Sequence, residues 1–123
     1  MRQLSLTVAR ARRAFTLIEI MIVVLIIGIL LAVAVPNFIR ARESSRAKSC
    51  VANLKQIDGA KEQWAMDNKK DAGAMPLPTD LYGVYTKFPP SCPSNGTYTI
   101  NGVGTNPTCS VGTQQGYNDH LLN

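Results

Sequence analysis

Glu19 is the residue in this sequence that most needs a partner, because it is a carboxylate near the start of a long apolar run. Apart from Thr16, Glu19 and Gly28, residues 15–35 are all Ala, Val, Ile, Leu, Met or Phe. A carboxylate near a bilayer core costs roughly 2.5 kcal/mol or more unless it gains a partner. We therefore predict that Glu19 pairs with a cation, in preference to lying unpaired at the membrane interface.

The three cysteines are the second set of reactive side chains. In a domain outside the cytoplasm they predict one disulfide and one odd thiol, with three possible pairings. We favour Cys92 with Cys109, which flank one turn-rich segment of 16 residues. The chain-entropy account gives about 3 kcal/mol for closing such a loop. Cys50 lies among apolar positions of an expected helix, so we interpret it as a small buried hydrophobic residue.

Metal binding, cofactors and catalysis are not expected from the remaining residues. The only histidine, His120, lies near the end of the sequence, and the cysteine spacings follow no zinc or haem pattern. We see no Gly-rich phosphate loop, nucleophile elbow or pair of carboxylates in the C-terminal part. These observations argue against an enzyme.

The apolar run is the element that positions Glu19. Its 21 residues, 15–35, would extend for about 31 Å as a helix, which matches one bilayer core. The upstream residues include four arginines and no acid, which predicts a cytoplasmic N-terminus and a C-terminal part on the outer side. The arginines are Arg2, Arg10, Arg12 and Arg13.

Residues 15–19 (Phe-Thr-Leu-Ile-Glu), Gly28 and residues 36–38 (Pro-Asn-Phe) resemble the N-terminus of type IV pilins and type II secretion pseudopilins. The resemblance implies a leader of residues 1–14, which prepilin peptidase removes before it methylates the new N-terminus at Phe15. Family members normally have Gly before the cut. This chain has Ala14 there, a departure that bears on the efficiency of processing.

The same resemblance implies how the subunit is assembled. Glu19 would pair with the Phe15 amine of a neighbouring subunit, inside a filament whose core is a bundle of these helices. Gly28 and Pro36 both weaken a helix, and the resemblance implies that the segment between them melts on assembly.

The implied function is a structural subunit of a type IV pilus or a pseudopilus, between which the sequence does not decide. The implied partners are identical or related pilin subunits, prepilin peptidase, membrane lipid, and an inner-membrane assembly platform with its ATPase. The implied location is the inner membrane, crossed once, and then a periplasmic or cell-surface filament.

The expected fold is α+β and pilin-like, with a long N-terminal helix packed on a small antiparallel β region. We divide the chain into the leader 1–14, a membrane or filament-core half 15–35, an amphipathic half 36–70, and a loop and β region 71–123. The amphipathic half repeats apolar residues every three or four positions and spaces Glu43 with Arg46, and Asp58 with Lys61, for i,i+3 pairs. The apolar positions are Ala47, Cys50, Val51, Leu54, Ile57, Ala60 or Lys61, and Trp64.

Shorter elements are expected after the helix. Asn68 to Gly73 predict its end near residue 70, and Thr79 with Asp80 predict the cap of a short helical turn. Residues 97–101 alternate as a strand, and residues 108–111 follow as its partner in a hairpin or meander. Residues 92–98 and 106–110 also resemble the C-terminal half of a subgroup of bacterial prepilin-like proteins, but no calcium site is implied.

The charge balance gives nucleic-acid binding no support. The sequence carries 13 basic and 8 acidic residues, with a pI near 9.4. Without the four leader arginines it is close to neutral, because nine basic residues then face eight acidic ones. A local patch of cations remains at Arg40, Arg42, Arg46 and Lys48.

Two alternatives stay open. The chain could be a single-pass membrane protein whose outer domain binds a ligand without polymerising. Alternatively, Ala32-Val33-Ala34 is a small-x-small site at which signal peptidase would release a soluble domain beginning at Val35. The charged region preceding such a signal would include Glu19, and its apolar segment would exceed the usual length, so we favour the filament subunit.

Overall fold

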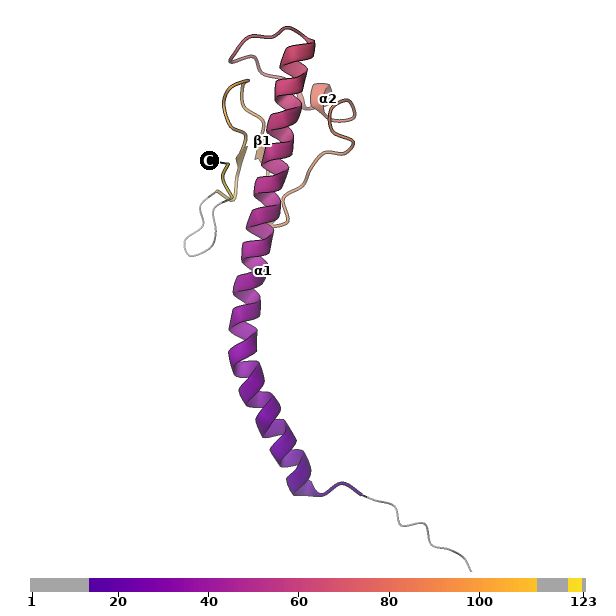
Figure 1. Cartoon of the computed structure of the whole chain (residues 1–123), viewed down its shortest axis with the longest axis vertical. Coiled ribbons are helices and arrows are strands. Elements are labelled where there is room, and N and C mark those ends of the chain that lie inside the picture. Colours follow the sequence, from indigo (N-terminus) through magenta and orange to yellow (C-terminus); the bar gives the residue numbers. More distant parts are fainter. Residues whose placement is uncertain (1–13, 113–119, 123) are drawn as a thin grey trace, which may run out of the picture. The chain divides into compact units, whose positions relative to one another are not determined.

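The computed structural model describes residues 14–112 and 120–122, so the predicted leader lies outside the described residues except for Ala14. The described chain divides into a unit that ends at Pro36 and a unit that begins at Asn37. Its elements are α1 (Leu17–Asp67), α2 (Pro78–Leu81), β1 (Tyr98–Thr99) and β2 (Thr108–Cys109), as shown in Figure 1. The α+β prediction is confirmed.

Helix α1 begins where the sequence provides a cap. The Glu19 N–H donates to Thr16 Oγ1 at 3.3 Å, and the Ile20 N–H donates to the Thr16 carbonyl at 3.4 Å. Threonine is a favoured N-cap residue, because its hydroxyl satisfies an amide that has no partner inside the helix. The regular helix therefore starts at Leu17, two residues after Phe15.

The helix ends at Asp67, slightly before the predicted end near residue 70. Lys69 adopts a left-handed backbone with a φ of 50°, and the Lys70 N–H reaches back to the Ala65 carbonyl at 2.9 Å. This geometry satisfies a terminal carbonyl in the manner of a C-cap motif. Lys69, and not the expected Gly73, therefore stops the helix.

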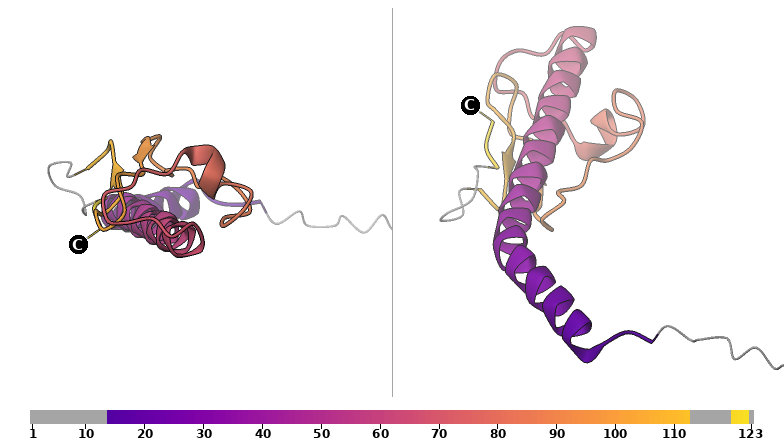
Figure 2. Two further views of the ribbon diagram at one scale, coloured as in Figure 1. Left: turned by 90° about the horizontal axis from the view of Figure 1, so that it is seen from above. Right: turned by 60° about the horizontal axis from the view of Figure 1, so that its bottom comes forward.

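The second unit buries one stripe of α1, as the apolar periodicity predicts. Val51 and Trp64 are only half-buried, whereas Ala65 is buried instead. The buried residues are Ala47, Cys50, Leu54, Ile57, Ala60, Lys61 and Ala65. Figure 2 shows the segment after α1 lying along one side of this part of the helix.

Both predicted i,i+3 ion pairs form, at 3.1 Å each, between Glu43 and Arg46 and between Asp58 and Lys61. Sequence reasoning left open whether Ala60 or Lys61 lies in the apolar stripe, and the structure buries both. The Lys61 side chain is fully buried, and its ammonium also donates to the Thr105 carbonyl. The lysine thus connects α1 to the loop between the strands, with its charge balanced by Asp58.

Helix α2 begins at Pro78, one residue before the predicted cap. Asp80 still serves the helix start, because its carboxylate accepts the Leu77 N–H at 3.0 Å. Leu81 is fully buried. The Tyr85 hydroxyl donates to Asp67 Oδ2 at 2.9 Å, so the segment after α2 is fixed to the end of α1.

Strands β1 and β2 form one antiparallel pair in which Tyr98 faces Cys109 and Thr99 faces Thr108. The hairpin is confirmed but is shorter than predicted. Asn101 adopts a left-handed φ of 58°, which ends the extended run after β1, and Pro107 has no N–H with which to lengthen β2. The hairpin places Cys109 against α1, where the sulfur of Cys50 lies.

Candidate functional site

The residues with predicted roles in processing and assembly lie at the start of the chain's first unit. Ala14 and Phe15 precede α1, lie outside regular secondary structure and are exposed. Glu19 lies in the first turn of α1 and is exposed as well. Among the described residues its carboxylate has no partner, whereas its backbone N–H is held by Thr16. The structure therefore leaves this carboxylate available to a group outside the described chain.

The apolar side chains around Glu19 are exposed along the whole first half of α1. From Phe15 to Val35 the large apolar residues are 46% to 79% exposed. A window of α1 has a mean hydropathy of 3.2, and α1 is the helix within the described residues that is long and apolar enough to cross a membrane. Such a surface requires lipid or other protein around it, because exposed apolar patches of this size are unfavourable in water.

Gly28 and Pro36 both lie inside α1. A Cβ added at Gly28 would meet no other atom within 4 Å, so nothing in the chain's own packing requires a glycine there. Pro36 has no N–H for the helical ladder. Their predicted role in melting during assembly remains a prediction.

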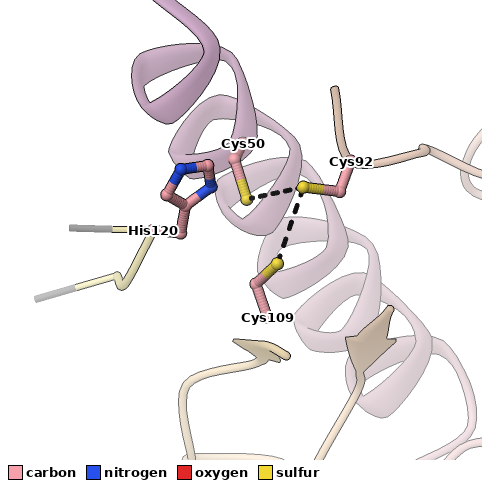
Figure 3. A group of neighbouring side chains, drawn as sticks. All are labelled: Cys50, Cys92, Cys109 and His120. Carbon is pink, nitrogen blue, oxygen red and sulfur yellow. Dashed lines mark hydrogen bonds between the residues drawn. The ribbon is translucent and has the colours of Figure 1, made fainter. Parts of the chain in front are cut away.

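A second group of chemically reactive side chains gathers in the unit that begins at Asn37. Cys50 of α1, Cys92 of the loop before β1, Cys109 of β2 and His120 are all buried, and their ligand atoms lie within 4.8 Å of one another. Figure 3 shows a ring nitrogen of His120 facing the sulfur of Cys50. We call these four residues the Cys/His cluster.

Hydrogen bonds connect the sulfurs of the Cys/His cluster. The Cys109 thiol donates to Cys92 Sγ at 3.7 Å, and the Cys92 thiol donates to Cys50 Sγ at 3.8 Å. The three cysteines are unbridged, because a disulfide would bring two sulfurs to about 2.05 Å. The favoured Cys92–Cys109 disulfide therefore remains a prediction, while the burial expected of Cys50 is confirmed.

Burial and hydrogen bonds shift the pKa values in this cluster in opposite directions. Burial raises the pKa of Cys50 to about 12, against a smaller opposing effect of the Tyr98 hydroxyl, which donates to Cys50 Sγ at 3.5 Å. Burial also acts to raise the pKa of Cys92, but the backbone amides of Ser94 and Gly96 donate to its sulfur and bring its net pKa below the usual value.

The loop 92–96 fits closely around two sulfurs. A Cβ added at Gly96 would lie 2.6 Å from Cys109 Sγ, closer than real Cβ atoms approach, and 3.2 Å from Cys92 Sγ, which is a tight contact. The loop is closed by the Asn95 N–H, which donates to the Cys92 carbonyl at 3.1 Å, with Asn95 in a left-handed conformation at a φ of 59°. This turn places Gly96 directly against the sulfurs of Cys92 and Cys109.

The family comparison concerns the other site, at the start of α1. Residues 9–35 match the model of the prokaryotic N-terminal methylation motif. The match covers Ala14, Phe15 and Glu19 together with the exposed apolar half of α1. The chain thus carries the prokaryotic N-terminal methylation motif, and it is similar to type IV pilins and type II secretion system proteins.

Three curated relatives match between 42% and 55% of this chain. Type IV major pilin protein PilA of Myxococcus xanthus is 50% identical over 52 residues, which is 42% of this chain and 24% of the relative. Type II secretion system core protein G of Klebsiella pneumoniae is 36% identical over 59 residues, or 48% of this chain and 42% of the relative. Competence protein ComGC of Streptococcus pneumoniae is 32% identical over 68 residues, or 55% of this chain and 63% of the relative.

In each of these three pairs the match covers less than two thirds of the relative's length. No solved structure matches the chain significantly. The methylation motif therefore accounts for residues 9–35, and the Cys/His cluster has to be interpreted from its own geometry. Sequence reasoning did not associate His120 with the cysteines, and no spacing in the sequence would have done so.

Proposed function

We propose that this protein is a structural subunit of a filament of the type IV pilus or pseudopilus class. The observation that carries the proposal is the exposed apolar half of α1, which bears one carboxylate without a partner among the described residues and matches the methylation motif. The relatives include both pilins and secretion proteins, so the proposal is made at the level of the filament. The protein's role is assembly and not catalysis.

Before assembly, residues 15–35 cross the inner membrane once, with the N-terminus in the cytoplasm. Prepilin peptidase cuts between Ala14 and Phe15 and methylates the new amine. During assembly the apolar half of α1 moves from lipid into a bundle of identical helices. Lipid tails and apolar side chains are similar solvents, so this transfer costs little free energy, and a platform protein with its ATPase can drive it.

Glu19 sets the axial position of each incoming subunit. Its carboxylate accepts the charged amine of a neighbouring Phe15, so that two groups that are costly in an apolar bundle neutralise each other. A buried ion pair adds little stability, but an unpaired buried charge is strongly unfavourable. Subunits that are displaced along the bundle are therefore rejected.

The position of Glu19 in the sequence also allows a local role that would compete with this one. Thr16 caps α1, and Glu19 stands three residues later, at the position that completes a capping box. Glutamine serves a capping box as well as glutamate does, but it cannot pair with an ammonium ion as an anion. The two roles can therefore be separated by one substitution.

The test compares Glu19→Gln and Glu19→Ala with Glu43→Ala, an acidic control on the same helix. We expect both Glu19 variants to insert into the membrane normally and to lower the yield of sheared filaments about tenfold or more, because either leaves the Phe15 amine unpaired. The Glu43 control should assemble at the level of the unaltered protein. Normal filament yield from Glu19→Gln would reject the pairing role and leave only the cap.

A further inference from the structure

We propose that Cys50, Cys92, Cys109 and His120 bind one zinc ion, which holds together the small C-terminal unit. The inference does not rest on the proposed filament function, because all four residues belong to the unit that begins at Asn37. Three thiolates and one imidazole are a recognised ligand set for structural zinc, with no position left open for a substrate. The soft sulfur ligands favour zinc over magnesium or calcium.

The distances between the sulfurs fit a tetrahedral metal centre. Zinc lies about 2.3 Å from a thiolate, so two thiolates at neighbouring corners of a tetrahedron are about 3.8 Å apart. Two of the three sulfur pairs in the cluster, Cys109–Cys92 and Cys92–Cys50, lie at 3.7 and 3.8 Å. A disulfide would require the sulfurs to approach to about 2.05 Å.

His120 gives an independent indication of a ligand. Its side chain is 5% exposed, and its Nδ1 has no hydrogen-bond partner among the residues that the structure describes. A buried polar atom without a partner is costly, and a metal ion would satisfy it. Two hydrogen bonds hold the backbone of the segment that carries this ring. The His120 N–H donates to the Gly112 carbonyl at 3.1 Å, and the Asn106 side chain donates to the Leu122 carbonyl at 3.1 Å.

Groups outside the four ligands support the sulfurs as they do in zinc sites. The Tyr98 hydroxyl donates to Cys50 Sγ, and Asn53 donates to that hydroxyl at 3.1 Å. Asn53 also donates to the Ser91 carbonyl at 2.9 Å, next to Cys92. Such outer contacts orient the ligands and stabilise the charge on thiolate sulfur.

The ion would connect four parts of the chain that are distant in sequence: α1, the loop before β1, strand β2 and the segment around His120. Among the described residues, the buried apolar cluster here consists of the three cysteines and Leu54, with Tyr98, Val111 and Leu122 packed against it. A domain with so small a core is the kind that needs a metal or a disulfide for stability. On binding, the three thiols release their protons to solvent, and no oxidant is required.

A zinc site and the Cys92–Cys109 disulfide exclude each other, because the disulfide consumes two of the thiolates. The full chain, purified in detergent without chelators or added reductant, should contain about one zinc per chain by elemental analysis. Replacing the zinc with Co²⁺ should give the intense visible bands of tetrahedral cobalt with thiolate ligands. Neither measurement requires a variant to fold.

Variants then identify the fourth ligand. His120→Ala should weaken zinc binding by at least tenfold, whereas His120→Cys should keep the metal, because four cysteines also form a zinc site. Tyr98→Phe should lower the affinity for zinc about tenfold, because it removes the hydrogen bond to Cys50. Met66→Leu, which removes an exposed sulfur from the same helix, is the control and should bind zinc normally.

Three results would overturn the proposal. The first is a metal-free protein with a Cys92–Cys109 disulfide in its peptide map. The second is a protein with three free thiols that does not take up Co²⁺ or Zn²⁺. The third is equal zinc affinity in the unaltered protein and His120→Ala, which would remove the histidine from the site.

Discussion

The two units of the chain use the same helix in opposite ways. In the first unit the apolar side chains of α1 are exposed on every side, whereas in the second the helix buries one stripe and leaves the rest in solvent. The apolar surface of the first unit therefore has to be covered by lipid or other protein, whereas that of the second unit is covered by the chain itself. This difference predicts where a substitution will unfold the protein and where it will affect only assembly.

The largest contrast is expected between two leucines of α1. Leu54 is fully buried beside the cysteines, while Leu25 is 63% exposed. Leu54→Ala should lower the free energy of unfolding of the second unit by about 2–5 kcal/mol, because it removes buried contacts and leaves a cavity. Leu25→Ala should leave that value unchanged. Urea unfolding followed by the fluorescence of Trp64, the only tryptophan, measures both.

Equal losses of stability in the two leucine variants would contradict the contrast. They would mean that the first half of α1 also depends on packing within the chain. A loss of stability in Leu54→Ala alone would support the contrast between the two units. It would support it further if the filament yield of this variant fell only in proportion to its folded fraction.

A smaller contrast is expected between two glycines. Gly96→Ala places a Cβ 2.6 Å from Cys109 Sγ and 2.7 Å from Val111 Cγ2, and overpacking of this kind typically costs about 1–3 kcal/mol. Gly28→Ala meets open space and should instead favour the helix by about 1 kcal/mol. Urea unfolding measures the first variant, and circular dichroism of the chain in detergent measures the second. A destabilising Gly28→Ala would show an unrecognised contact in the first unit.

The sequence predicts the first unit well, because its properties are local. Hydropathy, the basic leader and the motif around Glu19 each depend on neighbouring residues. In the second unit the same holds for the apolar stripe that includes Cys50 and Leu54, which repeats every three or four positions. The i,i+3 pairs also follow from spacing alone. What periodicity could not decide was the burial of Lys61, since this depends on a carbonyl at Thr105, 44 residues away.

The Cys/His cluster was beyond sequence reasoning for the same physical reason. Its ligands come from four segments that only the turns around Asn95 and Asn101 and the short hairpin bring together. Sequence reasoning instead paired Cys92 with Cys109 because they flank one loop. The two do lie close together, but Cys50 lies as near to Cys92 as Cys109 does, and His120 closes the group.

The mature N-terminus is the measurement that tests the central claim most directly. If the protein is a filament subunit of this family, a mass spectrum of protein purified from its native membrane should show a chain that starts at a methylated Phe15. A chain that starts at Val35 would mean that signal peptidase had released a soluble domain. A chain that keeps Met1 would mean an uncleaved membrane anchor, and either result would contradict the account.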